Sequence, residues 1–162
     1  MTIAGFKQRP ILLPRGPSRR AKQGLRTQFG ALCWREKDGE VQVLLVTSRR
    51  TKRWILPKGW PLHGMTPAKA AQAEAWEEAG AKGKVLPVCL GLYSYIKHQD
   101  RRDAVPCVVA VYPMKVVATE KNYPEANQRK RKWMSPKKAS KMVAEPELRR
   151  MLKDFDPTGL PD

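Results

Sequence analysis

The segment between Pro57 and Gly80 constrains the fold of this 162-residue chain most strongly. Directly after Pro57, residues 58–64 contain two glycines and another proline, so this part is expected to be a loop. Thr66 followed by Pro67 has the residue types of a helix N-cap and first helical position, and the alanine-rich run that follows stops before Gly80. We therefore predict a loop that leads into a helix of about four turns.

Segments on either side of this helix have the composition of β-strands. Residues 27–34 and 41–47 are apolar and β-branched, and the Asp-Gly pair between them predicts a β-hairpin. Residues 54–56 form a short apolar strand before the loop. Beyond the helix, residues 85–96 and 104–117 predict two longer strands joined by a charged turn.

Two proline-containing pairs predict further helices near the end of the chain. Ser135 and Pro136 open one helix, and Glu145 and Pro146 open another. Strands with helices interspersed, and at least one hairpin, predict an α/β (α+β) layered sandwich in which helices flank a mixed β-sheet.

The charge of the chain predicts an anionic partner. Lys and Arg number 32 against 15 Asp and Glu, which gives a formal net charge of +17. The excess lies mainly in residues 1–35 and 121–153, each of which carries +8. A cationic surface attracts polyanions of any chemistry, so nucleic acid is an alternative to a small-molecule partner. We interpret most side chains of the cationic run at residues 129–132 as a solvated basic face.

Composition divides the chain into three parts. Residues 1–24 form a basic, proline-containing arm, residues 25–153 hold one domain, and residues 154–162 form a tail. The arm has the basic composition of an organellar transit peptide, but its three prolines interrupt a long amphipathic helix. We therefore interpret it as an arm, with processing as the alternative.

Neither a membrane span nor a disulfide framework is expected. No apolar run approaches the ~18 residues of a transmembrane helix. Cys33, Cys89 and Cys107 are an odd set among apolar neighbours and lack zinc-ligand spacing, which favours buried free thiols in a reducing compartment. We therefore expect a cytoplasmic protein without a transmembrane segment.

Three glutamates lie on the predicted helix at positions i, i+3 and i+4: Glu74, Glu77 and Glu78. At about 100° per residue, their side chains project from one face within one turn. Like charges at this spacing repel one another, and a hard divalent cation such as Mg²⁺ would compensate them. The alternative is a surface helix with solvated glutamates.

With the glycines that bracket them, these glutamates resemble the signature of the Nudix hydrolases. In that signature a glycine, five residues and a glutamate precede seven residues, Arg-Glu, an aliphatic residue, any residue, Glu-Glu, any residue, a glycine and an aliphatic residue. The chain matches it at Gly59, Glu74, Glu77, Glu78 and Gly80. It departs at Met65, where the signature has glutamate, and at Ala73, where it has an arginine expected to orient a catalytic glutamate.

The resemblance covers residues 25–153 and implies both a fold and a reaction. Residues 54–59, 123–125 and 131–133 look like the diphosphoinositol polyphosphate phosphohydrolase branch. The implied fold places a loop-helix-loop beside a mixed sheet, and the implied reaction is hydrolysis of a phosphoanhydride (pyrophosphate) bond. The implied cofactor is Mg²⁺, with Mn²⁺ as an alternative. Its implied ligands are the Gly59 carbonyl group and the side chains of Glu74, Glu77 and Glu78, and these three glutamates are the implied catalytic residues.

Cations must receive the phosphates of such a substrate. Arg49, Arg50 and Arg53 precede the strand that leads into the loop and Lys58 lies within the loop, so we predict that they line a polyphosphate pocket. A solvated end of a hairpin is the alternative for Arg49 and Arg50. The candidates for a general base are Glu74 itself and the carboxylates of Asp100, Asp103, Glu120 and Glu125.

Two functions from different classes follow. The first is a Mg²⁺-dependent hydrolase of a highly phosphorylated small molecule, such as a diphosphoinositol polyphosphate or a dinucleoside polyphosphate. The second is a Nudix-fold module that binds RNA or another polyanion with weak or no catalysis, a reading in which Met65 and Ala73 signal weakened chemistry. An RNA 5′-pyrophosphohydrolase lies between the two.

Overall fold

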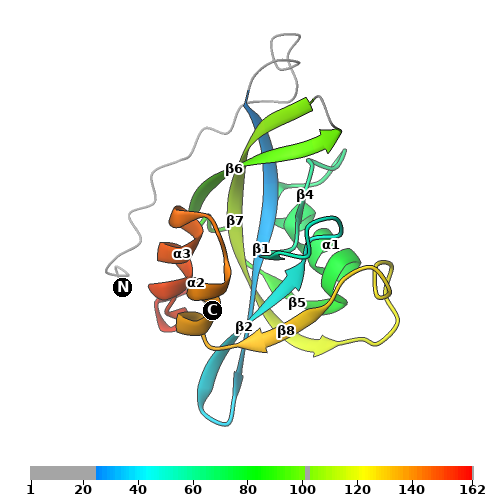
Figure 1. Ribbon diagram of the computed structural model, residues 1–162. Coiled ribbons are helices and arrows are strands. Elements are labelled where there is room, and N and C mark those ends of the chain that lie inside the picture. Colours follow the sequence, from blue (N-terminus) through cyan, green and yellow to red (C-terminus); the bar gives the residue numbers. More distant parts are fainter. Residues whose placement is uncertain (1–24, 101–102, 162) are drawn as a thin grey trace.

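The computed structural model describes residues 25–100 and 103–161 (Figure 1). The basic arm predicted for residues 1–24 lies outside the described residues. In the described part of the chain, no helix is both long and apolar enough to cross a membrane. The elements in chain order are β1 (Arg26–Lys37), β2 (Glu40–Thr47), β3 (Trp54–Ile55), β4 (Lys58–Gly59), α1 (Pro67–Ala79), β5 (Ala81–Val85), β6 (Gly91–Asp100), β7 (Asp103–Thr119), β8 (Arg131–Met134), α2 (Pro136–Met142), α3 (Pro146–Lys153) and the 3₁₀ turn η2 (Pro157–Gly159).

One mixed sheet forms the centre of the fold. Its strands follow the order β3-β2-β1-β7-β5, and β8, β4 and β6 pair with β2, β1 and β7 respectively. β1 runs parallel to β7, from Arg26 opposite Cys107 to Trp34 opposite Lys115. The other pairings in the sheet are antiparallel. The mixed sheet expected from the sequence is therefore confirmed.

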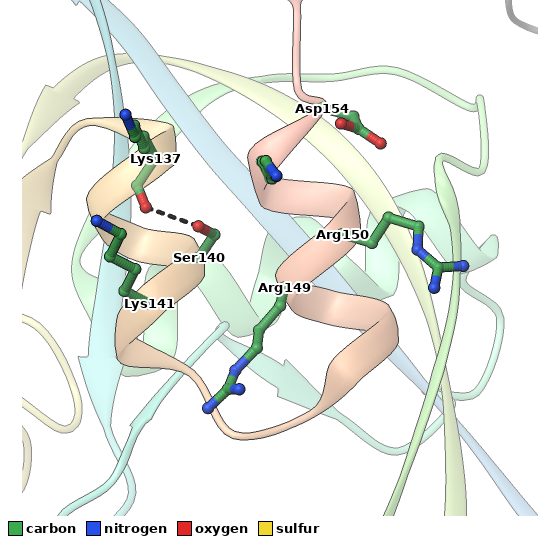
Figure 2. Close-up of a pocket in the computed structure, with 7 residues that line it drawn as sticks. Lys137, Ser140, Lys141, Arg149, Arg150 and Asp154 are labelled. Atoms are coloured by element: carbon green, nitrogen blue, oxygen red, sulfur yellow. Dashed lines mark hydrogen bonds between the residues drawn. The ribbon is translucent and has the colours of Figure 1, made fainter.

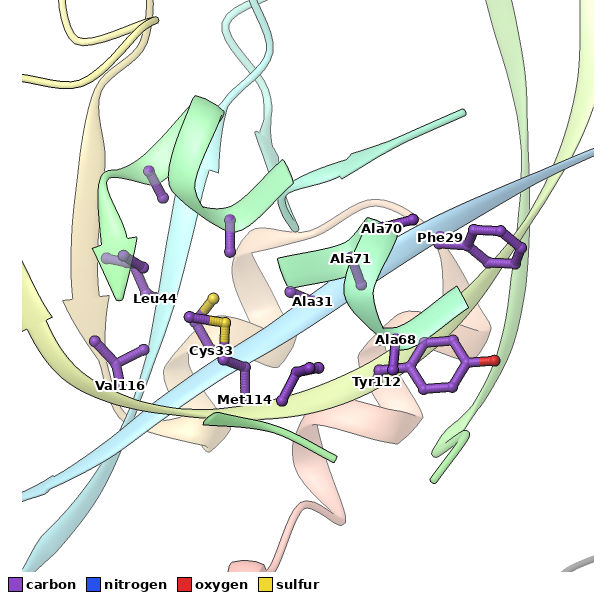
Figure 3. Packing of buried hydrophobic residues seen from close by; sticks show 14 of the residues in the cluster. Phe29, Ala31, Cys33, Leu44, Ala68, Ala70, Ala71, Tyr112, Met114 and Val116 are labelled. Atoms are coloured by element: carbon purple, nitrogen blue, oxygen red, sulfur yellow. The ribbon is translucent and has the colours of Figure 1, made fainter. Parts of the chain in front are cut away.

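Helices cover both faces of this sheet, α1 on one face and α2 with α3 on the other (Figure 1). In β1, Ala31 and Cys33 are buried in the cluster that includes the alanines of α1, whereas Leu32 and Trp34 belong to the cluster under α2 and α3. This division follows because successive side chains of a strand point to opposite faces. Figure 3 shows the cluster beneath α1, where small side chains let the helix approach the sheet. The layered α+β sandwich is confirmed.

The hairpin predicted at the start of the domain is present. β1 and β2 pair up to Lys37 and Glu40, on either side of the turn. The two turn residues, Asp38 and Gly39, have φ angles of +54° and +78°. Positive φ at both positions matches the tight turn whose twist suits two antiparallel strands, so the Asp-Gly signal was correctly interpreted.

The three predicted helices are also confirmed. Each begins at the proline that follows its cap residue. The side chains of Thr66 and Ser135 accept hydrogen bonds from the backbone N–H groups of Lys69 and Lys138, at 3.3 and 3.2 Å. These bonds satisfy N–H groups that the first turn of a helix leaves without a partner.

The single strand expected at residues 85–96 is wrong. β5 ends at Val85 and β6 begins at Gly91. Residues 86–90 between them include Pro87, which has no N–H group to donate to a sheet. Both strands pair with β7, β5 along its later part and β6 along its earlier part. At 17 residues, β7 is long enough to hold both.

The loop expected at residues 58–64 begins later than predicted. Lys58 and Gly59 form the two-residue strand β4, which pairs with β1. The N–H group of Ala31 also donates to the Pro57 carbonyl oxygen at 3.0 Å. Backbone pairing with β1 therefore overrides the local turn signals at these two residues.

Part of the predicted tail packs on the α2–α3 side of the fold. The ring of Phe155 meets Trp34 edge-on, with ring centroids 6.1 Å apart. Pro157 begins η2 and is buried. These contacts join the tail to the same apolar cluster that α2 and α3 cover.

Candidate active site

The C-terminal end of α1 is fixed by contacts with the start of β8 and the segment before it. Gly80 ends the helix with a φ of +62°, and a Cβ atom added there would overlap the Tyr123 ring. The Arg131 guanidinium group lies 4.8 Å above that ring and donates a hydrogen bond to the Ala79 carbonyl oxygen at 2.7 Å. A cation at a helix C-terminus is favourable, so these contacts stabilise the end of the helix that carries the glutamates.

The Glu74 carboxyl group lies against Gly59 of β4. A Cβ atom added to Gly59 would overlap this carboxyl group, so glycine leaves the room that the carboxylate occupies. Burial raises the pKa of Glu74, and the nearby charges of Glu77 and Glu125 add to this effect. A cation bound at this point would stabilise the ionised carboxylate.

Glu78 is buried, with only 6% of its surface exposed. Its Oε2 atom accepts a hydrogen bond from the backbone N–H group of Lys58 at 3.2 Å, and its Oε1 atom accepts one from Arg129 Nη2 at 3.2 Å. Burial raises the pKa of Glu78 to about 7, against the lowering effect of the Arg129 and Lys58 charges. Each carboxylate oxygen is therefore held by one donor.

Glu77 lies in different surroundings from the other two glutamates. Its side chain is exposed, and its backbone carbonyl oxygen accepts the N–H group of Glu125 at 3.0 Å. Among the described side chains, no three carboxylate, imidazole or thiol groups converge as a formed metal site. The donor types nevertheless fit Mg²⁺, because the Gly59 carbonyl group and the glutamate carboxylates are all hard oxygen ligands.

The solvated basic face predicted for residues 129–132 is wrong at Arg129. This side chain is only 8% exposed. Its guanidinium group donates to Glu78 at 3.2 Å, to Glu125 at 2.9 Å and to the Thr47 carbonyl oxygen at 3.1 Å. The backbone pairing of β8 with β2 carries the segment to this position, which local charge patterning does not reveal. Arg129 is the site residue that sequence reasoning missed.

The three arginines predicted to bind substrate lie at the surface. Arg49 and Arg53 are 58% and 49% exposed. Arg50 Nη1 donates to the His98 carbonyl oxygen at 3.4 Å, and Arg53 Nη1 lies 4.0 Å from Glu145 Oε1. All three side chains thus have protein partners at the surface, and their role in substrate binding stays a prediction.

Lys58, the fourth predicted substrate-binding cation, is half-buried. Its Nζ atom lies 4.8 Å from the centre of the Tyr95 ring. Burial lowers the pKa of Lys58, while the charges of Glu78 and Glu145 act in the opposite direction. The loop beyond it approaches β6 as well, since Lys97 Nζ lies 4.8 Å from the Trp60 ring.

The candidate general bases differ in how strongly other residues engage them. Glu125 pairs with two arginines, at 2.9 and 3.3 Å. Glu120 is 45% exposed and belongs to a surface ion pair. The side chains of Asp100 and Asp103 lie outside the described residues. Glu74 faces the Gly59 backbone, and the choice of base among these carboxylates stays a prediction.

A separate cavity of about 690 Å³ lies between α2 and α3. Figure 2 shows the ammonium groups of Lys137 and Lys141 and the guanidinium group of Arg150 pointing outward from the two helices rather than toward one another. Arg149 Nε is engaged by the Val143 carbonyl oxygen at 2.7 Å. This cavity is on the face of the sheet opposite α1, so it is separate from the glutamates.

The family model described as the NUDIX domain matches residues 24–155, a range that contains α1, β4 and the segment before β8. The chain belongs to the Nudix hydrolase family. The match includes every predicted site residue and also Arg129. The resemblance carried by the glycines and glutamates of α1 is therefore confirmed.

Relatives and solved structures agree with this assignment. Diphosphoinositol polyphosphate phosphohydrolase 2 of Rattus norvegicus is 30% identical over 124 residues, which cover 75% of this chain and 65% of that protein, a little under two thirds of its length. Diphosphoinositol polyphosphate phosphohydrolase 3-beta of Homo sapiens is 31% identical over 123 residues, with coverage of 75% and 71%. The Ap4A hydrolase of C. elegans, solved as a binary complex, has a TM-score of 0.59 at 19% identity over 79% of this chain and 93% of that one, which shows a shared fold.

Proposed function

We infer that this Nudix chain is a metal-dependent pyrophosphohydrolase of a highly phosphorylated small molecule, either a diphosphoinositol polyphosphate or a dinucleoside polyphosphate. The observation that carries the proposal is the placement of Glu74 and Glu78 against β4, one over Gly59 and one bonded to the Lys58 backbone. The names of the relatives support the substrate class. The net charge of +17 is suited to a substrate with many phosphates.

A divalent ion, Mg²⁺ or Mn²⁺, would be held by the Gly59 carbonyl group, Glu74, Glu77 and Glu78. When bound, such an ion polarises phosphoryl oxygens and lowers the pKa of a water ligand. In this proposal Glu74, whose carboxyl group lies against Gly59, accepts the proton of the attacking water.

The cations around the glutamates have two roles in this proposal. Arg49, Arg50 and Arg53 supply exposed positive charge for the distal phosphates, while the half-buried Lys58 offers an ammonium group beside β4. The Lys58 ammonium group lies over the Tyr95 ring, and Trp60, directly after β4, lies under the Lys97 ammonium group.

The test is phosphate or pyrophosphate release from a panel with and without Mg²⁺, followed by removal of the ion with a chelator. The panel contains diphosphoinositol polyphosphates, diadenosine polyphosphates, nucleoside triphosphates, ADP-ribose and triphosphorylated RNA. We expect metal-dependent turnover on one of the first two classes, and a loss of at least about 100-fold in kcat for Glu78→Gln. Glu36→Gln, an exposed change in β1, is the matched control and should keep full activity.

Three outcomes would contradict the proposal. Turnover confined to triphosphorylated RNA would assign an RNA 5′-pyrophosphohydrolase. No turnover of any member of the panel, together with salt-sensitive RNA binding that is unchanged in Glu78→Gln, would assign a binding module. Full activity of a folded Glu78→Gln variant would show that turnover does not need the Glu78 carboxylate.

A further inference from the structure

Helix α1 lacks the arginine that the Nudix signature places directly before the first glutamate of the helix, which is Glu74 in this chain. Ala73 stands at that position. The one basic residue of α1 is Lys69, in its first turn, and Lys69 Nζ donates to Gln72 Oε1 at 3.3 Å rather than to a glutamate. The charge that orients a site glutamate must therefore come from outside α1.

Arg129 brings such a charge from a different element. Nη2 donates to Glu78 Oε1 at 3.2 Å, Nε to Glu125 Oε2 at 2.9 Å and Nη1 to the Thr47 carbonyl oxygen at 3.1 Å. All three guanidinium nitrogens are thus engaged, in a side chain that is 8% exposed. Because the guanidinium group is planar, hydrogen bonds at Nε and Nη1 fix the direction in which Nη2 donates.

The partners of Arg129 are themselves held in place. Arg49 Nη1 pairs with the second carboxylate oxygen of Glu125 at 3.3 Å. The N–H group of Thr47 donates to the Lys130 carbonyl oxygen at 2.9 Å, and the N–H group of Lys130 donates to Thr47 Oγ1 at 2.9 Å. The segment that carries Arg129 is therefore docked on the end of β2, with the guanidinium group directed at Glu78.

We propose that Arg129 is the positioning residue of this site, which orients the Glu78 carboxylate from the β8 side in place of an arginine on α1. The Lys58 N–H group holds Oε2 and Arg129 holds Oε1, so the two donors together fix the plane of the carboxylate. The role of Arg129 in turnover rests on the proposed hydrolase function.

The first test compares kinetics of Arg129→Ala, Arg129→Lys and the matched control Lys130→Ala, which removes an exposed neighbouring charge. Loss of a group that orients a site ligand costs about 10- to 100-fold in activity, so kcat should fall by that factor in Arg129→Ala while KM changes little. Arg129→Lys keeps the charge but not the fork, and its kcat should stay low. Lys130→Ala should match the wild type.

A wild-type kcat in either folded Arg129 variant would overturn the proposal. So would a large gain in kcat for Ala73→Arg in the otherwise unchanged chain, because it would mean that the glutamates lack an orienting arginine. We expect Ala73→Arg to leave kcat close to that of the wild type.

The second test needs neither metal nor substrate. Thermal melting of the metal-free wild type, Arg129→Lys, Glu78→Gln and the double variant forms a double-mutant cycle. The Tm loss of the double variant should be smaller than the sum of the two single losses, since both changes remove the same contact. If the Tm losses of the two single variants add up in the double variant, the contact between Arg129 and Glu78 is overturned. If the losses are coupled but the wild type shows no turnover on the panel, only the proposed function is overturned.

Discussion

At the scale of single residues, small side chains decide where the charged groups of this Nudix chain can go. Gly59 has no Cβ atom where the Glu74 carboxyl group lies. Gly83 is closer still to its surroundings, and there the neighbour is the backbone carbonyl of Lys115. A flexible side-chain end can move away from a new methyl group, while a backbone carbonyl in a sheet cannot do so without disturbing the strand.

These two glycines therefore predict opposite phenotypes. Gly59→Ala should change the free energy of unfolding by less than about 1 kcal/mol, because Glu74 turns aside, and lower kcat about tenfold or more, because the displaced carboxylate belongs to the site. Gly83→Ala should destabilise the protein by about 1–3 kcal/mol and leave kcat of the folded fraction unchanged.

Urea unfolding and turnover measured on the same preparations separate the two effects. If Gly59→Ala kept full activity, the Glu74 carboxylate would not need its position over Gly59. If Gly83→Ala were as stable as the wild type, the bulge at Gly83 would be able to relax.

At the scale of elements, α1 is the part of the site that local chemistry specifies most completely. Thr66 caps its first turn, Pro67 begins it, and Gly80 ends it in the left-handed conformation. The bounds predicted from these residues agree with the structure because caps and prolines act on their immediate neighbours. The placement of Glu74 and Glu78 along the helix follows from the same bounds.

Removal of the cap should weaken α1. Thr66→Ala loses the hydrogen bond from the Lys69 N–H group, and we expect the free energy of unfolding to fall by about 1 kcal/mol. Thr66→Ser retains a hydroxyl group and is the matched control, with stability near that of the wild type. Equal midpoints in urea for all three proteins would show that the 3.3 Å contact contributes nothing.

At the scale of the whole molecule, the mixed sheet brings oppositely charged groups to one place in a strongly cationic chain. The carboxylates of Glu78 and Glu125 pair with the buried Arg129, whereas Arg49 and Arg53 form ion pairs at the surface. The whole-chain charge of +17 sets the long-range field that a polyanion meets. The buried Arg129–Glu78 pair can affect a polyanion only once the polyanion has bound.

This division predicts how the proposed turnover responds to salt. The screening length falls from about 10 Å at 0.1 M salt to about 3 Å at 1 M, so added KCl should lower kcat/KM toward a polyphosphorylated substrate. The value of kcat should stay constant, because the Arg129–Glu78 pair is largely shielded from solvent. Initial-rate measurements over a KCl series test both statements, and a kcat that fell in parallel with kcat/KM would contradict the second.

The sequence by itself determined the features that depend on neighbouring residues: the capped helices, the Asp-Gly hairpin and the spacing of the glutamates, from which the Nudix family could be recognised. Only the tertiary structure decided that β4 pairs with β1, that β5 and β6 share β7, and that Arg129 reaches Glu78 from a distant segment. Caps and turns are short-range effects, whereas backbone pairing and buried ion pairs join residues far apart in the chain, so no local pattern reports them. The roles of Arg49, Arg50 and Arg53, and the expected cytoplasmic location, stay predictions.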